Sequence, residues 1–388
     1  MSQLVKTIKD RCHECYSCVR NCPAKAVRVK NGQAEVIEER CIHCANCVRI
    51  CSQGAKRVKN DKDSVKKLLN GKEKIVVGLA PSFPSYNSNL NLSDWENLLT
   101  GLGFAGVYEV AWGAEMIIEE YKKLLNKRDN MIISTPCPVV VRYVEKYYPE
   151  LVPNLAPIVS PMAALARYIK EIEGKETKVV MVGPCQAKKM ELEDESSVSA
   201  VLTFSEIMEL IEYFNTTFDS SIQQNEKGEL TSKRELEKEQ NGYSIESGRK
   251  IPLPGGLAEV VKKQIKESIE CFRVEGNEKI TSLFDSIIEN EIHPQFVDVL
   301  FCEGCISGVD LVEQSYFKKE KVVQEFIKHQ PDIKNKVNYD NSIVGQVDLS
   351  TSFENDYKGL SSPEEDEIWN ILNKTNKYKE EDLLNCGA

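Results

Sequence analysis

Long apolar segments are absent from this chain of 388 residues. No run of about 18 apolar residues occurs, which excludes a typical membrane-spanning helix. The first residues, MSQLVKTIKDRCHEC, lack the apolar core and the small-residue cleavage site of a secretory signal peptide. We therefore expect a cytoplasmic protein, with no membrane and no nucleic acid among its partners.

No residue class dominates the composition, since 41% of the residues are hydrophobic and 28% are charged. The length permits a large core and predicts two or three domains. The number of cysteines is nevertheless notable: the chain has 14, and eight of them fall between Cys12 and Cys51. Disulfides are typical of small secreted domains, so in a large chain without a signal peptide these cysteines indicate metal binding.

An internal repeat opens the chain. RCHECYSCVRNCPAKAV at Arg11–Val27 recurs as RCIHCANCVRICSQGAK at Arg40–Lys56, 29 residues later, and each copy contains C-x2-C-x2-C-x3-C. Two-residue gaps let three thiolates of a tight loop bind one [4Fe-4S] cluster, while the remote fourth cysteine binds the other cluster. The predicted ligands are Cys12, Cys15, Cys18 and Cys51 for the first cluster, and Cys41, Cys44, Cys47 and Cys22 for the second.

Zinc is the alternative, because pairs of C-x2-C also bind zinc. Two interleaved sets of four cysteines, the first followed by Pro23, favour iron-sulfur clusters. We expect His13 and His43, which lie among the ligands, to be exposed loop residues. Residues 1–59 resemble bacterial two-cluster ferredoxins, and the resemblance implies an α+β ferredoxin-like domain that moves single electrons.

Positive charge is concentrated in the same segment. Residues 1–59 hold 12 Lys and Arg against 5 Asp and Glu, whereas the rest of the chain holds 38 against 55. The basic residues either offset the charge of bound thiolates or form a docking face for an acidic electron carrier, because opposed fields accelerate encounter.

The sequence pattern of the remainder of the chain predicts an α/β region. Continuous apolar runs are typical of buried parallel strands, and helical patterns at Val139–Tyr148 and Met162–Glu173 lie between them. The four runs are Lys74–Leu79, Met131–Ile133, Val179–Val182 and Val297–Phe301. We predict a connector at 60–73 with a helix at Val65–Leu69, and a polar surface insertion at 215–250.

Four further cysteines lie in the segments STPCPVV, GPCQAKKME and FCEGCISG, each at the end of a predicted strand. They are Cys137, Cys185, Cys302 and Cys305. Each alone could be a buried core cysteine. Together they suffice for one more [4Fe-4S] cluster, and Cys137 precedes a helix whose N-terminal dipole favours negative charge. Ligands of open α/β sheets collect at this edge.

In the same order, the three segments resemble the signature segments of the [FeFe] hydrogenase family, over roughly Lys74–Tyr378. The resemblance implies an α/β H-cluster domain at 74–378. It also implies that Cys137, Cys185, Cys302 and Cys305 bind a cubane, with Cys305 bridging to a two-iron subsite that carries CO, cyanide and a dithiolate.

Two segments match the groups that hold the cyanides of this H-cluster. Lys188 matches the lysine that hydrogen-bonds one cyanide, a contact that is strong in a dry pocket. Ala80, Pro81 and Ser82 match the segment that packs on the other. The alternatives are a solvated Lys188 and a Ser82 that only begins a helix.

Several positions depart from the prototypical enzymes. Pro136 stands where the family has its proton-delivering cysteine, Tyr121 replaces the relay glutamate, and Ala156 replaces the relay serine. A positioned acid contributes about 10²- to 10⁴-fold, so these changes predict slow turnover. Glu120, with Glu119 beside it, is a candidate for another route, unless both are ordinary surface glutamates. The candidate catalytic residues are Lys188, Ser82, Pro81 and Glu120.

Two smaller departures accompany them. Gly183 replaces a methionine, and Cys302 and Cys305 are separated by two residues instead of three. This pattern resembles the sensory branches of the family, called groups C and D. The tail at 379–388 ends in Asn385-Cys386-Gly387-Ala388, which looks like the start of a further iron-sulfur motif, unless Cys386 is incidental. Cys271 matches no ligand motif, so we expect it to be structural.

The resemblance therefore implies a slow, sensory hydrogenase that interconverts H2 with protons and electrons. Electrons would pass through the two ferredoxin-like clusters to a soluble carrier such as ferredoxin. Maturation proteins would supply the two-iron subsite, and a downstream module would carry the signal. The alternative is a non-catalytic hydrogenase-like iron-sulfur protein of electron transfer or cluster assembly, without the two-iron subsite.

Overall fold

The computed structural model describes residues 4–127, 130–193, 195–217, 245–265, 269–311, 315–329, 341–357, 364–374 and 378–379. Most of the predicted insertion and Cys386 lie outside the described residues. The chain forms two compact units, Met1–Asp356 and Tyr357–Ala388, and the second contains α16 (Glu365–Lys374). No described helix has the length and apolar character needed to cross a membrane. The predicted domain boundaries stay predictions.

The N-terminal repeats fold as two similar halves. Strand β1 (Val5–Thr7) pairs antiparallel with β4 (Lys56–Val58), and β2 (Val27–Lys30) pairs antiparallel with β3 (Gln33–Val36). Each half holds a short helix, α1 (Ser17–Arg20) or α2 (Asn46–Arg49), which follows a residue with left-handed backbone. The equivalent positions 14 and 43 share φ values of 57° and 59°. The repeat is therefore structural as well as sequential, as a ferredoxin-like α+β segment requires.

Two parallel sheets form the larger region. The first has the strand order β6 (Gly106–Glu109), β5 (Ile75–Leu79), β8 (Lys178–Gly183), β9 (Ala200–Thr203). The second has the order β10 (Cys271–Glu275), β11 (Phe296–Leu300), β7 (Ile132–Ile133). All five residues of β5 and of β11 are buried, which explains why both strands are mainly apolar. The exception is the buried Asp298 of β11, which accepts hydrogen bonds from the Ser134 hydroxyl and the Ala258 amide. The four predicted strands are confirmed as β5, β7, β8 and β11.

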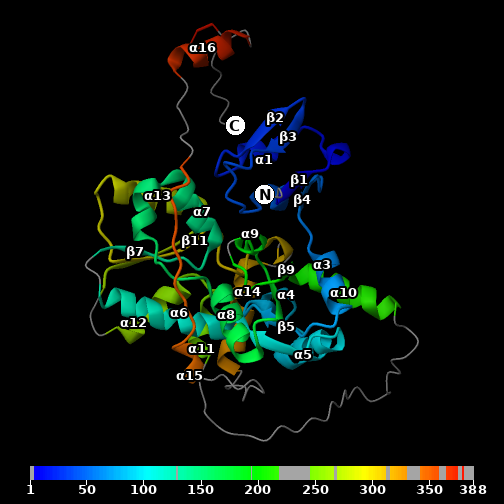
Figure 1. The fold of residues 1–388 in the computed structure, drawn as a ribbon. Coiled ribbons are helices and arrows are strands. Elements are labelled where there is room, and N and C mark those ends of the chain that lie inside the picture. Colours follow the sequence, from blue (N-terminus) through cyan, green and yellow to red (C-terminus); the bar gives the residue numbers. More distant parts are fainter. Residues whose placement is uncertain are drawn as a thin grey trace, which may run out of the picture. The chain divides into compact units, whose positions relative to one another are not determined.

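Helices surround both sheets (Figure 1). Helices α7 (Pro138–Tyr147) and α8 (Pro161–Glu173) confirm the two predicted ones, and α3 (Lys62–Leu69) confirms the helix in the connector. Helix α6 (Val110–Leu125) crosses α8 closely at Gly113, where a Cβ would lie 2.1 Å from the carbonyl oxygen of Pro161. The other helices are α4 (Phe83–Tyr86), α5 (Leu92–Gly101), α9 (Lys188–Glu191), α10 (Phe204–Thr217), α11 (Glu246–Lys250), α12 (Gly256–Gln264), α13 (Asn277–Ile288), α14 (Tyr316–His329) and α15 (Asn341–Val344).

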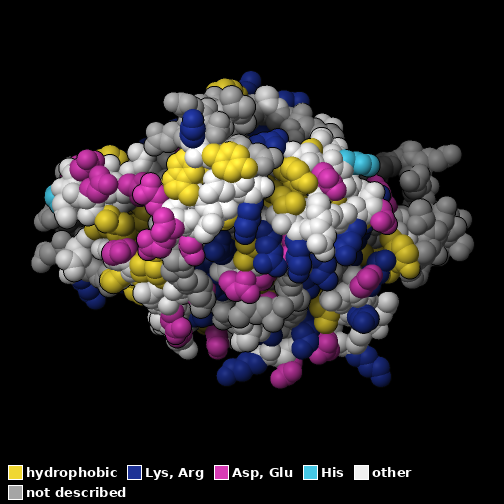
Figure 2. All heavy atoms as spheres, turned by 90° about the horizontal axis from the view of Figure 1, so that it is seen from above, with side chains coloured by type: hydrophobic (Ala, Val, Ile, Leu, Met, Phe, Trp, Pro, Cys, Tyr) yellow, Lys and Arg dark blue, Asp and Glu magenta, His cyan; other side chains and the backbone are white. Residues whose placement is uncertain are grey.

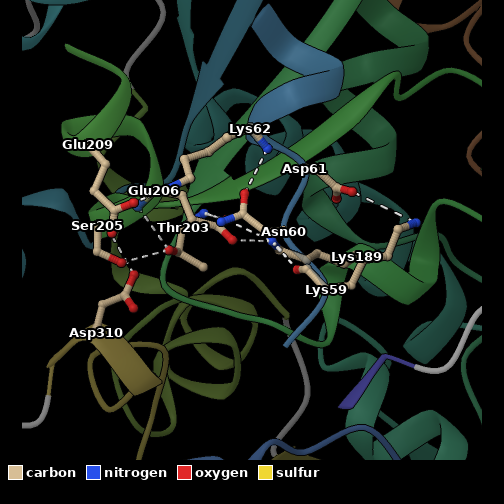
Figure 3. Close-up of polar contacts among 10 residues, drawn as sticks. All are labelled: Lys59, Asn60, Asp61, Lys62, Lys189, Thr203, Ser205, Glu206, Glu209 and Asp310. Carbon is tan, nitrogen blue, oxygen red and sulfur yellow. Dashed lines mark hydrogen bonds and ion pairs between the residues drawn. The ribbon is translucent and has the colours of Figure 1, made fainter. Parts of the chain in front are cut away.

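A buried polar network fastens the end of the N-terminal region to the hydrogenase-like region (Figure 3). The Lys189 ammonium, whose side chain has no exposed surface, donates to both carboxylate oxygens of Glu206 at 2.6 and 2.7 Å. It also donates to the main-chain oxygen of Lys59 at 2.9 Å. Nearby, Lys62 pairs with Glu209, and the Ser205 amide donates to Asp310. The first residues after β4 are thus held against α9 and α10.

Helix α7 makes a second attachment. The Tyr147 hydroxyl donates to the carbonyl oxygens of Ala24 and Arg40 at 2.6 and 2.8 Å, so it contacts both repeats. Within residues 4–59, all of which the structure describes, Lys56 is the one buried residue among the lysines and arginines. Lys and Arg side chains gather near the centre of the face seen in Figure 2. The basic charge therefore lies mainly on the surface.

Candidate metal centre

The structure brings together cysteines of opposite repeats. Burial raises the pKa of Cys18, Lys56 lowers it, and the nearby thiols of Cys51 and Cys12 raise it further. In the other half, burial raises the pKa of Cys41 to about 11 and of Cys47 to about 12, and Cys22 contributes to both shifts. Cys51 thus lies near Cys18, and Cys22 lies near Cys41 and Cys47, an arrangement consistent with interleaved ligation.

Main-chain amides support this exchange symmetrically. The Ala26 amide donates to Cys22 Sγ at 3.2 Å, and the equivalent Ala55 amide donates to Cys51 Sγ at 3.3 Å. Such N–H groups stabilise thiolates that bind a cluster. Cys15, the remaining predicted ligand of the first set, is exposed.

We expect Cys22→Ser to damage the cluster of Cys41, Cys44 and Cys47, because Cys22 lies with that set. Cys51→Ser should damage the cluster of the first repeat. The measurement is electron paramagnetic resonance of the reduced clusters together with iron content. Cys271→Ser is the control, since Cys271 lies in β10 and packs against the core. Loss of the Cys12, Cys15 and Cys18 cluster in Cys22→Ser would contradict interleaving.

A cavity of about 90 Å³ is lined by the four predicted ligand cysteines of the larger region and by Cys44 of the ferredoxin-like region. Cys137 follows β7 and begins α7, Cys185 follows β8, and Cys302 follows β11. Parallel strands present their carboxyl ends at one edge, which is where ligands of α/β sheets gather. The pairing of β7 with β11 thus explains why Cys137 and Cys302 meet, and Cys185 joins them from the carboxyl end of β8 in the first sheet.

Burial makes these thiols expensive to ionise without a cation. It raises the pKa of Cys185 to about 11 and of Cys302 to about 12, and the pKa of Cys305 rises higher still. Neighbouring cysteines raise all three values further. A bound metal group would supply the compensating positive charge. Within the described residues, no group of three or more His, Cys, Asp or Glu side chains is placed to hold a single metal ion.

An inner cavity of about 100 Å³ adjoins the first, and the two share Pro184, Cys185, Leu300 and Cys305. Its wall contains every residue that the sequence assigned to the two-iron subsite. These are Cys305, Lys188, Ala80, Pro81 and Ser82, with Pro136 and Gly183 beside them. A Cβ at Gly183 would lie 2.9 Å from the Ala80 Cβ, so the methionine found in relatives would require Ala80 to move.

Ser82 and Lys188 fit a polar guest in this cavity. Ser82 begins α4, but its hydroxyl makes no capping hydrogen bond; it is buried without a partner among the described residues. The Lys188 side chain is 17% exposed and donates to Pro136 O at 3.2 Å and to Glu191 Oε2 at 2.6 Å. An ammonium has three donors, so one remains. A buried unpaired hydroxyl and a spare cationic donor suit anionic ligands such as cyanide.

Glu120 is not part of this cavity. It forms a surface ion pair with Lys123 at 2.7 Å and lines a separate pocket beside Pro157 and Ser350. Glu119 pairs with Lys122 in the same way.

Tyr121 lies in a closed hydrogen-bond network instead of a proton route. Its fully buried hydroxyl accepts from the Thr135 amide at 2.8 Å and bonds the Thr135 hydroxyl at 2.9 Å. The Thr135 hydroxyl also lies 3.1 Å from Ala156 O and 2.9 Å from Ile158 O. Burial raises the pKa of Tyr121 far above its usual range. Tyr121 and Ala156, which stand at positions of the expected relay, are thus linked through Thr135. The network ends, however, on the main-chain carbonyl oxygens of Ala156 and Ile158.

Sequence reasoning missed several site residues. Glu191 follows Lys188 by three residues, a spacing at which charged side chains pair on a helix, so GPCQAKKME held a usable signal. Thr135 gave none. The prediction that both histidines are exposed is confirmed for His13 and wrong for His43, which is 7% exposed and whose Nε2 bonds Glu38 Oε1 at 2.8 Å.

Comparison with known families agrees with this arrangement. A model described as iron only hydrogenase large subunit, C-terminal domain, matches residues 73–309, and a 4Fe-4S dicluster domain model matches residues 4–52. Since the first match covers more than half of the chain, the protein belongs to the iron-only, or [FeFe], hydrogenase family. It combines a ferredoxin-like segment with an α/β hydrogenase domain.

Particular relatives fall into two groups. Iron hydrogenase 1 of Clostridium pasteurianum is 26% identical over 295 residues, 63% of this chain and 51% of that protein. The cytosolic Fe-S cluster assembly factor NAR1 of Scheffersomyces stipitis is 26% identical over 156 residues, 34% of this chain and 29% of that protein. The chain thus spans about half, or less, of these relatives' length.

Solved structures share the fold. The apo [FeFe] hydrogenase of Chlamydomonas reinhardtii superposes with a TM-score of 0.54 at 16% identity, covering 77% of this chain and 100% of that chain. A structure from a study of stepwise H-cluster assembly gives a TM-score of 0.55 with the same identity and coverage.

Proposed function

We propose that this protein is a slow, sensory [FeFe] hydrogenase that holds an H-cluster and two [4Fe-4S] clusters. One observation carries the proposal: Cys305, Lys188 and the unpaired hydroxyl of Ser82 line a single inner cavity that adjoins the four-cysteine cavity. A cubane alone would need no cyanide partners. When bound, the two-iron subsite supplies the chemistry that interconverts H2 with two protons and two electrons.

The chain's own residues would hold and insulate this group. Cys137, Cys185, Cys302 and Cys305 would bind the cubane, while Lys188 and Ser82 would donate to the cyanides. The inner wall is otherwise largely apolar, which excludes water and strengthens these polar contacts. Cys44 lines the four-cysteine cavity, so an electron would pass from there to the second ferredoxin-like cluster and then to the first.

The slow and sensory parts of the proposal rest on the proton route. Pro136 has no acidic proton, and the Tyr121 network ends on carbonyl oxygens. A hydrogenase site without an efficient proton route suits the detection of H2 better than its rapid consumption. The exposed basic residues of the ferredoxin-like segment favour an acidic electron carrier.

The rival function, a cluster-assembly or electron-transfer protein without the two-iron subsite, is supported by the match to NAR1. Infrared spectroscopy of protein matured under anaerobic conditions separates the two. We expect bands of bound CO and cyanide. Full cubane content without such bands would overturn the hydrogenase proposal.

Lys188→Met should lower retention of the two-iron subsite and spare the cubanes. The substitution removes the cationic donor from a desolvated cavity and leaves Glu191 with only the Ser160 hydroxyl as a partner. The intensity of the CO and cyanide bands per iron measures the effect. Lys123→Met is the matched control, because Lys123 belongs to an i,i+3 pair at the surface. Unchanged bands in Lys188→Met would remove Lys188 from the site.

A further inference from the structure

Arg20 and Arg49 occupy equivalent positions in the two repeats, at the ends of α1 and α2. Both residues are exposed, yet their surroundings differ. The Arg20 guanidinium donates to the carbonyl oxygen of Cys15 at 3.1 Å, within its own repeat. Arg49 instead lines the four-cysteine cavity, together with Cys302 and Cys305 of the larger region. The second repeat thus places its arginine at the junction of the two regions.

The guanidinium of Arg49 is oriented by a neutral group. It donates to Asn46 Oδ1 at 3.0 Å, and Asn46 Nδ2 donates in turn to the carbonyl oxygen of Asn21 in the other repeat at 2.8 Å. The first repeat has Ser17 at the position equivalent to Asn46. Within the described part of the chain, no carboxylate forms an ion pair with Arg49. The positive charge is therefore held in place without being compensated.

No other fixed charge faces this cavity. Among the described residues that line it, Arg49 is the one member of the Lys, Arg, Asp and Glu set, and the polar groups beside it, such as Gln186 and Asn277, are neutral. A cubane bound by four thiolates has a net negative charge, and the potential of such a cluster depends on the charges and hydrogen bonds around it. The one cation in the wall is therefore in a position to influence that potential.

The charge of Arg49 acts on one of the predicted ligands. Burial and the neighbouring thiols of Cys137 and Cys185 raise the pKa of Cys302 to about 12. Arg49 lowers this pKa, because a nearby cation favours the thiolate, whereas the exposed Glu303 raises it. Arg49 thus favours negative charge at the large site.

The same place is the contact between two predicted clusters. Burial raises the pKa of Cys44 well above its usual value, and Cys302 of the larger region contributes to the rise. Cys44 belongs to the second ferredoxin-like cluster, and Cys302 belongs to the cubane of the larger region. Since both line the cavity together with Arg49, the arginine lies at the step where an electron passes between the two clusters.

We propose that Arg49 raises the reduction potential of the large-site cubane, the one bound by the four cysteines of this cavity, and so draws electrons to it from the second ferredoxin-like cluster. Reduction adds one negative charge to the cubane, and a nearby cation stabilises that state more than the oxidised state. An arginine keeps its charge at every working pH, so the effect involves no titration of Arg49. The inference rests on the cluster assignments of the proposed function, but not on hydrogenase activity.

The test uses the full chain with its three cubanes reconstituted and no two-iron subsite. Redox titration followed by electron paramagnetic resonance should give a lower midpoint potential of the large-site cubane in Arg49→Met than in the parent. This shift should exceed any shift of the two ferredoxin-like clusters. The large-site signal is the one that Cys185→Ala removes. Arg20→Met is the matched control at the equivalent exposed position, and it should leave the large-site potential unchanged.

Two further measurements separate the charge of Arg49 from its packing. Arg49→Lys should restore most of the potential, because it keeps the positive charge while losing the planar fork that binds Asn46. A higher ionic strength should reduce the difference between the parent and Arg49→Met, since the charge of an exposed residue is screened by salt. A difference caused by altered packing would not respond to salt in this way.

Three results would overturn the proposal: equal large-site potentials in the parent and Arg49→Met, an equal fall in Arg49→Lys and Arg49→Met, or an equal fall in Arg20→Met. A parent protein that binds only two cubanes would overturn it together with the cluster assignments. Missing CO and cyanide bands in matured protein would overturn the hydrogenase function alone, because the potentials are measured without the two-iron subsite.

Discussion

Lys189→Met is expected to lower the free energy of unfolding by about 3–5 kcal/mol, the usual cost of removing one partner from a buried ion pair. Its ammonium is fully buried and binds Glu206 through both oxygens. Without it, the Glu206 carboxylate keeps only the Thr203 amide, at 2.9 Å, in an apolar setting. The Lys59 carbonyl also loses its donor, so the attachment of the ferredoxin-like region should loosen.

Urea denaturation of cluster-containing protein measures this effect, and hydrogen exchange near Lys59 reports the loosening. Lys263→Met is the matched control, because Lys263 and Glu259 form an exposed pair whose loss should cost about 0–1 kcal/mol. The double variant Lys189→Met with Glu206→Gln should recover part of the loss, since it removes the uncompensated charge. Equal losses in Lys189→Met and Lys263→Met would show that burial does not govern this pair.

Much of the fold could be predicted because buried parallel strands have a strong local signal. The runs that became β5, β8 and β11 are mainly apolar on both faces, with Lys178 and Asp298 as the charged exceptions, since helices cover both sides of each sheet. Strand β10 could not be found in this way, because its pattern, CFRVE, is only partly buried and contains two charges. Its place at the sheet edge is set by pairing with β11, which is a long-range contact.

Part of the candidate site could be predicted from the sequence for a similar reason. Cysteine spacing in the repeat is a local property, and it indicated which thiols the fold brings together. Contacts between regions are not local. His43 lines one pocket with Ala187 and Met190 of the larger region, and the Tyr121 hydroxyl of α6 bonds the Thr135 hydroxyl in the segment after β7. The residue spacing within each segment cannot predict such contacts between distant segments.

Pro136→Cys should raise H2 turnover only modestly. The new thiol would stand where a proton donor is expected, worth about 10²- to 10⁴-fold in a working route. Behind it, however, Tyr121 and Thr135 still end on the carbonyl oxygens of Ala156 and Ile158. A donor that cannot be reprotonated is used once and then limits the rate.

Adding Tyr121→Glu and Ala156→Ser should raise turnover further and by more than the sum of the separate effects, because relay members act as one unit. The Thr135 amide, which now donates to the Tyr121 hydroxyl, could donate to the new carboxylate. Pro136→Ala is the matched control, since it frees the same backbone N–H without supplying a proton donor. Rates are compared per unit of CO and cyanide band intensity. If the triple variant with intact bands is no faster than the parent, proton delivery does not limit this protein. The altered wall at Gly183, or the shortened spacing between Cys302 and Cys305, then becomes the better explanation of slow turnover.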